Sequence, residues 1–112
     1  MNPLAITKLL SDEYTVKILT ATFKVPRTAN YLCMKFNIPV AACYRRINEL
    51  EELGLIEVTE KILTQRGKRV SLYRSNLRSA YLSFEGGRLK ATLELSDSSR
   101  SEEEAIMNVV RP

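Results

Sequence analysis

The sequence predicts an α+β fold, with helices in the first half of the chain and strands in the second. Within residues 28–53, apolar residues recur at helical spacing in two short stretches joined by a tight turn at Asn37-Ile38-Pro39. Residues 55–74 instead alternate apolar and polar side chains around a basic turn at 65–69. A similar pattern surrounds Gly86-Gly87. With 112 residues, the chain suits one domain with a small extension.

Two helices are expected before residue 28. Residues 2–10 can form one or two helical turns, with Asn2 as N-cap and Pro3 at the first helical position. This segment is either a packing arm or part of a dimer interface. Ser11 is a good N-cap for the next helix, which we expect to end near residue 23 because a proline follows.

Two further helices flank the tight turn. Thr28 is expected to cap a helix over residues 29–36, and Asn37 tolerates the left-handed conformation that ends helices. The following helix, over residues 39–53, is stopped by Gly54. Its buried seam is expected to contain three residues at helical spacing: Cys43, Ile47 and Leu50.

A second face of the helix over 39–53 carries no acid. Its residues repeat at the same helical spacing: Ala41, Tyr44, Arg45 and Asn48. The small Ala41 permits close approach to base edges, while Arg45 and Asn48 have the hydrogen-bonding geometry to read guanine and adenine. The alternative is that Arg45 and Arg46 are solvated or paired with Glu49. The acid-free surroundings favour DNA contact for Arg45 and leave Arg46 open.

The basic residues are clustered. No acid occurs from residue 14 to 48 or from residue 61 to 84, and each stretch contains six bases. These are Lys17, Lys24, Arg27, Lys35, Arg45 and Arg46 in the first stretch, and Lys61, Arg66, Lys68, Arg69, Arg74 and Arg78 in the second. The net charge of +4 is modest, but clustering attracts phosphates more than an even distribution would.

Two helices around a tight turn, followed by a hairpin with a basic tip, form the plan of a winged helix-turn-helix. This module usually lays its second helix in a DNA major groove. We therefore assign residues 1–76 to a winged helix DNA-binding domain with an N-terminal arm, a three-helix core and a β-wing. The wing strands are expected at 55–63 and 70–74. We interpret the tip bases, Arg66, Lys68 and Arg69, as phosphate contacts rather than as only a soluble turn.

Residues 77–112 are predicted to form a β-hairpin and a short terminal helix, as a dimerisation or packing extension. A two-residue loop at Gly86-Gly87 pairs Glu85 with Arg88 and places the apolar pairs on one face. Those pairs are Phe84–Leu89, Leu82–Ala91 and Ala80–Leu93. Either the winged domain or a second subunit must cover this face, because a lone hairpin is marginal in water. Ser101 and Glu104 form a capping box for the terminal helix, with a frayed tail as the alternative.

Composition excludes several functions. Histidine is absent, which removes imidazole-dependent catalysis and most zinc sites, and no Gly-rich phosphate loop occurs. We expect no enzyme activity and no cofactor. Cys33 and Cys43 lie on apolar stripes, so we interpret them as core residues rather than as a thiol sensor. No apolar run approaches the roughly 18 residues of a membrane span. The N-terminus is a poor signal peptide, so we expect a cytoplasmic protein without a membrane partner.

Residues 37–56 resemble the recognition-helix segment of ArsR-like winged helix transcriptional regulators, particularly archaeal ones. The distinctive part is Tyr44-Arg45-Arg46 followed by Glu-Leu-Glu-Glu-Leu-Gly-Leu-Ile over residues 49–56. Leu72-Tyr73-Arg74, which ends the wing, is similar to that group as well, and the resemblance covers residues 10–75. It implies a homodimer that binds a palindromic operator and regulates transcription.

The resemblance also implies site residues. Positions facing bases or backbone would be Val40, Ala41, Tyr44 and Arg45, and the wing contacts would be Arg66, Lys68 and Arg69. Many members have Ser or Thr near positions 41 and 42, where hydroxyls bind phosphate, whereas this chain has Ala at both. The clustered ligands of metal-sensing members are missing, so metal sensing is not implied.

The main hypothesis is a sequence-dependent, dimeric DNA-binding transcriptional regulator. The residues expected at DNA are Thr28, Val40, Ala41, Tyr44, Arg45, Arg46, Asn48, Arg66, Lys68 and Arg69. The alternative is a winged helix that serves as a protein–protein interaction module in a larger, transcription-related assembly. An RNA-binding winged helix is a third possibility.

Overall fold

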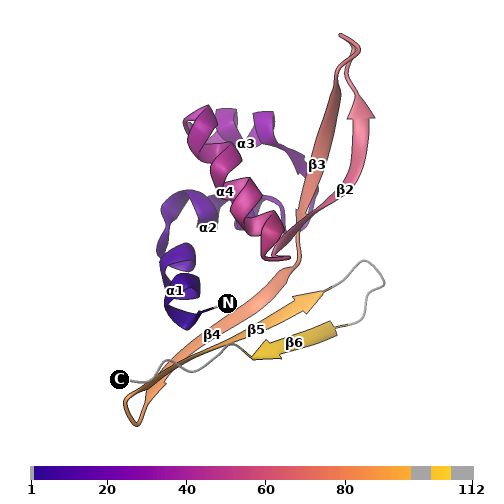
Figure 1. Cartoon of the computed structure of the whole chain (residues 1–112). Helices are drawn as coiled ribbons and strands as arrows, with labels where there is room; N and C mark the ends of the chain where they lie inside the picture. The colour runs from indigo at the N-terminus through magenta and orange to yellow at the C-terminus, as the bar shows by residue number, and fades with distance from the viewer. Residues whose placement is uncertain (1, 97–101, 107–112) are drawn as a thin grey trace. The chain divides into compact units, whose positions relative to one another are not determined.

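The computed structural model describes residues 2–96 and 102–106. Over these residues the chain is an α+β protein with four helices and two three-stranded antiparallel sheets (Figure 1). It divides into two compact units, one made of residues 14–76 and the other of residues 1–13 together with 77–112. This arrangement is compatible with a winged-helix-like fold for the first unit.

The unit of residues 14–76 contains three helices and one sheet. In chain order its elements are α2 (Glu13–Ala21), β1 (Arg27–Thr28), α3 (Ala29–Phe36), α4 (Val40–Glu52), β2 (Ile56–Leu63) and β3 (Arg69–Ser75). The sheet order is β1-β3-β2, with β3 in the middle. The core combines one face of each helix with the start of β2: Ile18, Leu32, Ile47, Leu50, Leu55 and Ile56 are at most 1% exposed. The helical stripes expected from the sequence are therefore the buried faces.

The turn between α3 and α4 has the expected construction. The Tyr31 backbone N–H donates to the Thr28 side-chain oxygen at 3.1 Å, so Thr28 is the N-cap of α3. Asn37 adopts the left-handed conformation, with φ of 53°, and ends the helix. Ile38 is 4% exposed and its N–H donates to the Cys33 carbonyl at 3.0 Å. This buried residue anchors the start of α4 against α3.

Two details of the helix ends differ from the sequence-based expectations. Ser11 does not cap α2 but is the last residue of α1, and its hydroxyl donates to the Lys8 carbonyl at 2.9 Å. Asp12 is the C-cap that separates the two helices. Pro39 is the N-cap of α4 rather than its first helical residue. Short capping signals fix a boundary only to within one or two residues.

The other unit contains α1 (Pro3–Ser11) and the sheet β4-β5-β6, formed by Leu77–Glu85, Arg88–Ser96 and Glu102–Ile106. Asn2 caps α1 by accepting from the Leu4 N–H at 2.7 Å, as expected. The β4–β5 register confirms every pair derived from the sequence, from Glu85↔Arg88 to Ala80↔Leu93. The Gly86-Gly87 loop and the sorting of apolar residues were sufficient to define it.

Two expectations about this unit were wrong. The terminal segment is not a helix over its described part but strand β6, which pairs with β5. Pairing with β6 gives hydrogen-bond partners to the backbone groups on the second edge of β5. This long-range pairing outweighs the local capping signal for a helix, since tertiary context overrides propensity. The N-terminal arm does not belong with residues 14–76. Helix α1 instead packs on β5, where Ile6 of the helix and Ala91 and Leu93 of the strand are at most 1% exposed. The helix covers part of the apolar face of the sheet, and this burial is favourable because exposing apolar surface to water costs free energy.

Within the described residues, no helix has the length and apolar character that crossing a membrane requires.

Candidate nucleic-acid interface

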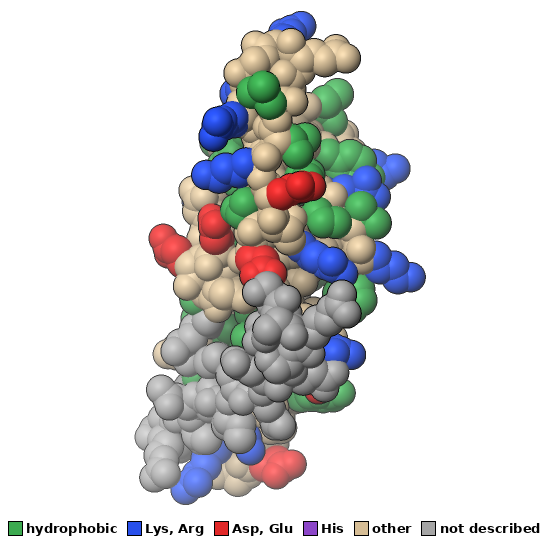
Figure 2. All heavy atoms as spheres, turned by 90° about the vertical axis from the view of Figure 1, so that its right-hand side faces the viewer, with side chains coloured by type: hydrophobic (Ala, Val, Ile, Leu, Met, Phe, Trp, Pro, Cys, Tyr) green, Lys and Arg blue, Asp and Glu red, His purple; other side chains and the backbone are tan. Residues whose placement is uncertain are grey.

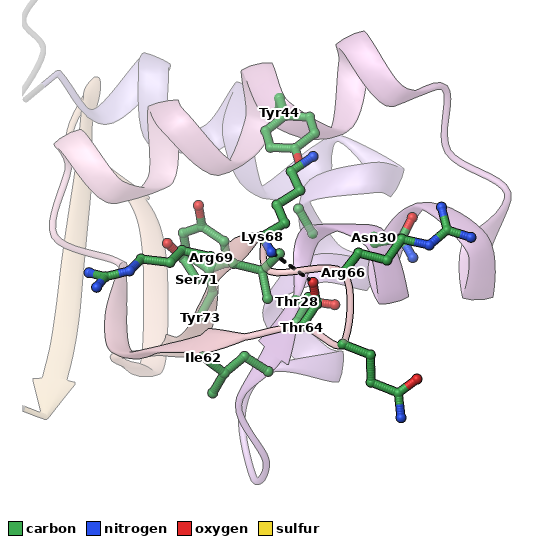
Figure 3. A pocket seen from close by; sticks show the side chains of 13 residues that line it. Thr28, Asn30, Tyr44, Ile62, Thr64, Arg66, Lys68, Arg69, Ser71 and Tyr73 are labelled. Atoms are coloured by element: carbon green, nitrogen blue, oxygen red, sulfur yellow. Dashed lines mark hydrogen bonds between the residues drawn. The ribbon is translucent and has the colours of Figure 1, made fainter.

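A groove of about 750 Å³ lies between the start of α3, helix α4 and the β2–β3 hairpin. All of its lining residues belong to the unit of residues 14–76. Tyr44 reaches into the groove from α4, while Arg66, Lys68 and Arg69 approach it from the hairpin (Figure 3). Thr28 and Asn30 contribute from the start of α3. Five residues expected at DNA from the sequence thus line one hollow: Thr28, Tyr44, Arg66, Lys68 and Arg69.

The hairpin tip is held in one conformation by its own backbone. The Thr64 N–H donates to the Lys68 carbonyl at 2.8 Å, and the Gly67 N–H donates to the Thr64 carbonyl at 2.9 Å. The Lys68 N–H donates to the Thr64 hydroxyl at 3.1 Å, drawn as a dashed line in Figure 3. Gly67 has φ of 78°, a value that favours glycine. A fixed turn loses less conformational entropy when its basic side chains bind a ligand.

Thr28 is fixed by two interactions. Besides capping α3, it pairs with Leu72 across the β1–β3 ladder.

The adjacent Arg27 places its guanidinium 4.3 Å from the centre of the Tyr31 ring. Arg27 is half-buried, and its buried Nε has no hydrogen-bond partner among the described residues. Because Arg27 is half-buried and its guanidinium lies over the Tyr31 ring, we do not count it among the exposed basic contacts.

The exposed face of α4 continues from Tyr44 away from the groove. Tyr44 is 47% exposed and Val40 63% exposed. Ala41, Arg45 and Asn48 are also exposed, whereas the opposite residues Cys43 and Ile47 are fully buried. Arg46 is half-buried and takes part in an interaction, whereas Arg45 is exposed. The α4 residues that the helical spacing had selected, Ala41, Tyr44, Arg45 and Asn48, are therefore all exposed.

Tyr73 lies at the floor of the groove, on β3. Burial raises the pKa of its phenol, and the nearby Glu51 carboxylate and Tyr44 phenol raise it further, although a hydrogen bond with Ser71 lowers it. The Tyr73 hydroxyl is consequently protonated at neutral pH and can act as a donor to an anion. Figure 3 shows Ser71 and Tyr73 pointing from β3 to the same side.

Charge is distributed unevenly along the hairpin. Its distal turn carries Arg66, Lys68 and Arg69, all exposed, and no acid. The acids Glu57 and Glu60 are the second and fifth residues of β2, further from this turn. In Figure 2 several Lys and Arg side chains lie at the upper end of this face, and no carboxylate is seen there. Arg78, grouped with these bases from the sequence, belongs to the other unit and lies 3.7 Å from Glu94.

Several groove residues were not found from the sequence: Asn30, Ile62, Thr64, Gln65, Val70, Ser71 and Tyr73. Part of the signal was present, because Arg69, Ser71 and Tyr73 alternate along one strand and must share a face. Conversely, Val40, Ala41, Arg45, Arg46 and Asn48 do not line the groove, although all of them lie on α4. The sequence indicated the basic tip but not the hollow beneath it.

The two cysteines are free and buried, at 8% exposure for Cys33 and 0% for Cys43. Burial raises the pKa of the Cys43 thiol to about 12, and the hydrogen bond and charge of Cys33 act in the same direction. Because the folded pKa is raised above the value of 9.0 for a free thiol, this contribution to stability is lost as the pH rises from about 9 to about 12. The thiol is therefore inert at neutral pH, as expected for a core residue.

We expect iodoacetamide at pH 8 to modify Cys43 in the native protein at least about 100-fold more slowly than in urea, because only the thiolate reacts. Mass spectrometry of timed samples measures both rates, and the urea-unfolded chain is the control. Comparable rates in the two states would show that the thiol is accessible and ionised, contrary to this assignment.

No protein-family model, curated protein or solved structure matches the chain at a significant level. The ArsR-like resemblance of residues 37–56 thus stays an expectation from the sequence. Among the described residues, no group of three or more potential ligands is arranged to hold a metal ion. The site must therefore be interpreted from its own geometry and charge.

Proposed function

We propose that residues 14–76 form a winged helix that binds double-stranded DNA and acts in transcription regulation. Helix α4 lies in the major groove in this arrangement, and the β2–β3 hairpin is the wing, which contacts the backbone. The observation that supports this proposal best is the groove that connects Tyr44 of α4 with Arg66, Lys68 and Arg69 of the hairpin tip. A continuous surface from a helix to a basic hairpin suits a polyanion with a regular helical shape.

The two parts of this surface have different tasks. The bases at the hairpin tip meet phosphates, which gives affinity without sequence information. The exposed face of α4 can reach base edges, because it begins with Val40 and Ala41 and carries Arg45 one turn further on and Asn48 two turns further on. Arginine binds guanine with two hydrogen bonds, and asparagine binds adenine similarly. Binding is therefore expected to be sequence-dependent.

A homodimer belongs to the same proposal. One helix of 13 residues reads only a few base pairs, so two copies on a two-fold symmetric site increase both affinity and specificity. The two α4 helices would then meet half-sites separated by roughly 34 Å, one turn of the duplex. The alternative, a protein–protein interaction module, uses the same basic groove for an acidic partner.

A duplex-binding assay in increasing salt separates these functions. DNA binding predicts retardation of random duplex at low salt and a steep linear fall of log affinity with log salt concentration. Absence of retardation at low salt would exclude DNA and favour the protein–protein module. A preference for single-stranded or structured RNA over duplex DNA would instead favour the RNA-binding alternative.

Arg45→Ala tests base reading by α4. We expect it to cost about 1–3 kcal/mol on a preferred site, obtained by selection from random duplexes, and much less on random DNA. The matched control is Lys35→Ala, which removes an exposed base from α3 instead. An equal loss on both kinds of DNA would show that Arg45 touches phosphate only.

A further inference from the structure

Strand β4 forms an open edge of the sheet β4-β5-β6, since no strand among the described residues pairs with its outer side (Figure 1). It is nine residues long, whereas strands are typically about five or six. Exposed edges are usually protected by lysine, proline or a bulge. β4 contains no lysine or proline, and its irregularity lies at its beginning, between Leu77 and Ser79. The edge of β4 therefore has none of these protective features from Ser79 to Glu85.

The backbone groups on this edge can be identified from the loop. Both loop glycines have positive φ, 58° for Gly86 and 74° for Gly87, which corresponds to a type I′ turn with a hydrogen-bonded closing pair Glu85–Arg88. Hydrogen-bonded and non-hydrogen-bonded pairs alternate along an antiparallel ladder. It follows that Ala80, Leu82 and Phe84 direct their N–H and C=O groups outward, away from β5.

The same residues leave apolar surface uncovered. Phe84 is 73% exposed and Leu82 43% exposed. The neighbouring part of this face is covered, since Ala91 and Leu93 on β5 are buried and α1 packs there. Unpaired backbone groups and exposed apolar side chains thus coincide at residues 80–84. Each alone is ordinary, but together they favour association of another strand.

We propose that β4 pairs antiparallel with β4 of a second copy of this chain, with Leu82 on the two-fold axis, to join the two sheets into one of six strands. An axis perpendicular to the sheet places residues of the same face opposite each other. With Leu82 at the centre, Phe84 of each copy faces Ala80 of the other. The largest side chain of the face then lies beside the smallest, and all three outward-pointing residues contribute hydrogen bonds.

Charge complementarity selects a second copy as the occupant. Arg78 and Glu85 are the two charged residues of β4 and stand at opposite ends. Antiparallel pairing brings the Arg78 end of each strand to the Glu85 end of the other, whereas parallel pairing would bring like charges together. In the proposed register Glu85 faces Ser79 of the other copy, next to Arg78, which lies within the irregularity between Leu77 and Ser79. The side chain of Arg78 and that of Glu94, 3.7 Å apart, are both over 40% exposed, so the guanidinium remains at the surface.

The strand pairing itself requires no DNA. This interface therefore rests on the proposed function only for the role that the dimer has. Sedimentation equilibrium without DNA is therefore the first test. We expect a mass twice the 12.8 kDa of one chain at micromolar concentrations. A monomer that still binds duplex with a steep salt dependence would overturn the interface and leave the proposed function intact.

Leu82→Lys should raise the dissociation constant of the dimer by roughly 100-fold or more, because each dimer would bury two lysine side chains. The matched control is Tyr81→Lys: Tyr81 is 67% exposed, points to the other face and directs its backbone groups to β5. We expect this control to remain dimeric. Circular dichroism verifies that both variants fold, and a folded Leu82→Lys variant that stays dimeric would overturn the proposal.

A cysteine pair tests the register without disturbing the edge. Hydrogen-bonded antiparallel partners have Cα atoms about 5.5 Å apart, within the range of a disulfide. Leu82→Cys should therefore form a covalent dimer under mild oxidation, while Ser83→Cys, one residue away, should remain largely uncrosslinked. The native cysteines are buried and do not interfere. Crosslinking of Ser83→Cys but not of Leu82→Cys would overturn the register.

Discussion

Replacing Arg66, Lys68 and Arg69 together by alanine is expected to weaken duplex binding by roughly 10²–10³-fold at about 0.1 M salt. Each contact between a base and a phosphate contributes about 0.9 to the slope of log affinity against log salt concentration. Loss of all three should therefore reduce the slope by about 2.7. Fluorescence anisotropy titrations at several salt concentrations measure both quantities.

The control for this variant removes three bases from the other unit: Lys8, Arg88 and Lys90, all exposed. It changes the net charge equally but leaves the groove intact, so its slope should change by much less. Equal slopes for the two triple variants would mean that only the total charge matters. That result would remove the hairpin tip from the interface.

Ile47→Ala is expected to lower the free energy of unfolding by about 2–5 kcal/mol, the range for truncating a large buried aliphatic residue. Ile47 is fully buried on α4, with Cys43 and Leu50 on the same face. Because that face fixes α4 in the unit of residues 14–76, the loss should appear as a lower urea midpoint. Duplex affinity should fall only at temperatures where the variant unfolds.

Asn48→Ala is the matched control, since Asn48 follows Ile47 but points outward. Surface substitutions usually change stability by no more than about 0.5 kcal/mol. The two substitutions should therefore have different effects. Ile47→Ala should lower the free energy of unfolding, and Asn48→Ala should change DNA recognition. A cost of less than about 1 kcal/mol for Ile47→Ala would contradict its place in the core.

Local signals predicted most of the secondary structure. Thr28 caps its helix through its own side chain, and Asn37 ends the same helix in the left-handed conformation, so both features are properties of neighbouring residues. The β4–β5 register followed from the Gly86-Gly87 loop, because a two-residue turn leaves one alignment that sorts the apolar residues. The exposed and buried faces of α4 followed from helical spacing.

Distant contacts decided what the sequence did not predict. Residues 102–106 carry a helix-start signal, yet they form β6 because β5 offers a strand edge. Helix α1 has an apolar face whose partner lies more than 80 residues away in the chain, and no periodicity reveals such a pairing. The groove depends likewise on how the hairpin lies against α3 and α4, and the spacing of residues within each element does not determine this.

The packing of α1 on β5 has a consequence for biosynthesis. Helix α1 is made more than 70 residues before β5, so the unit that contains both is discontinuous and cannot close until residues 88–96 have been made. Residues 14–76, in contrast, form a continuous segment that can fold while the remainder is still being made. A ribosome stalled shortly after this segment has emerged should therefore display residues 14–76 folded and helix α1 without its partner strand.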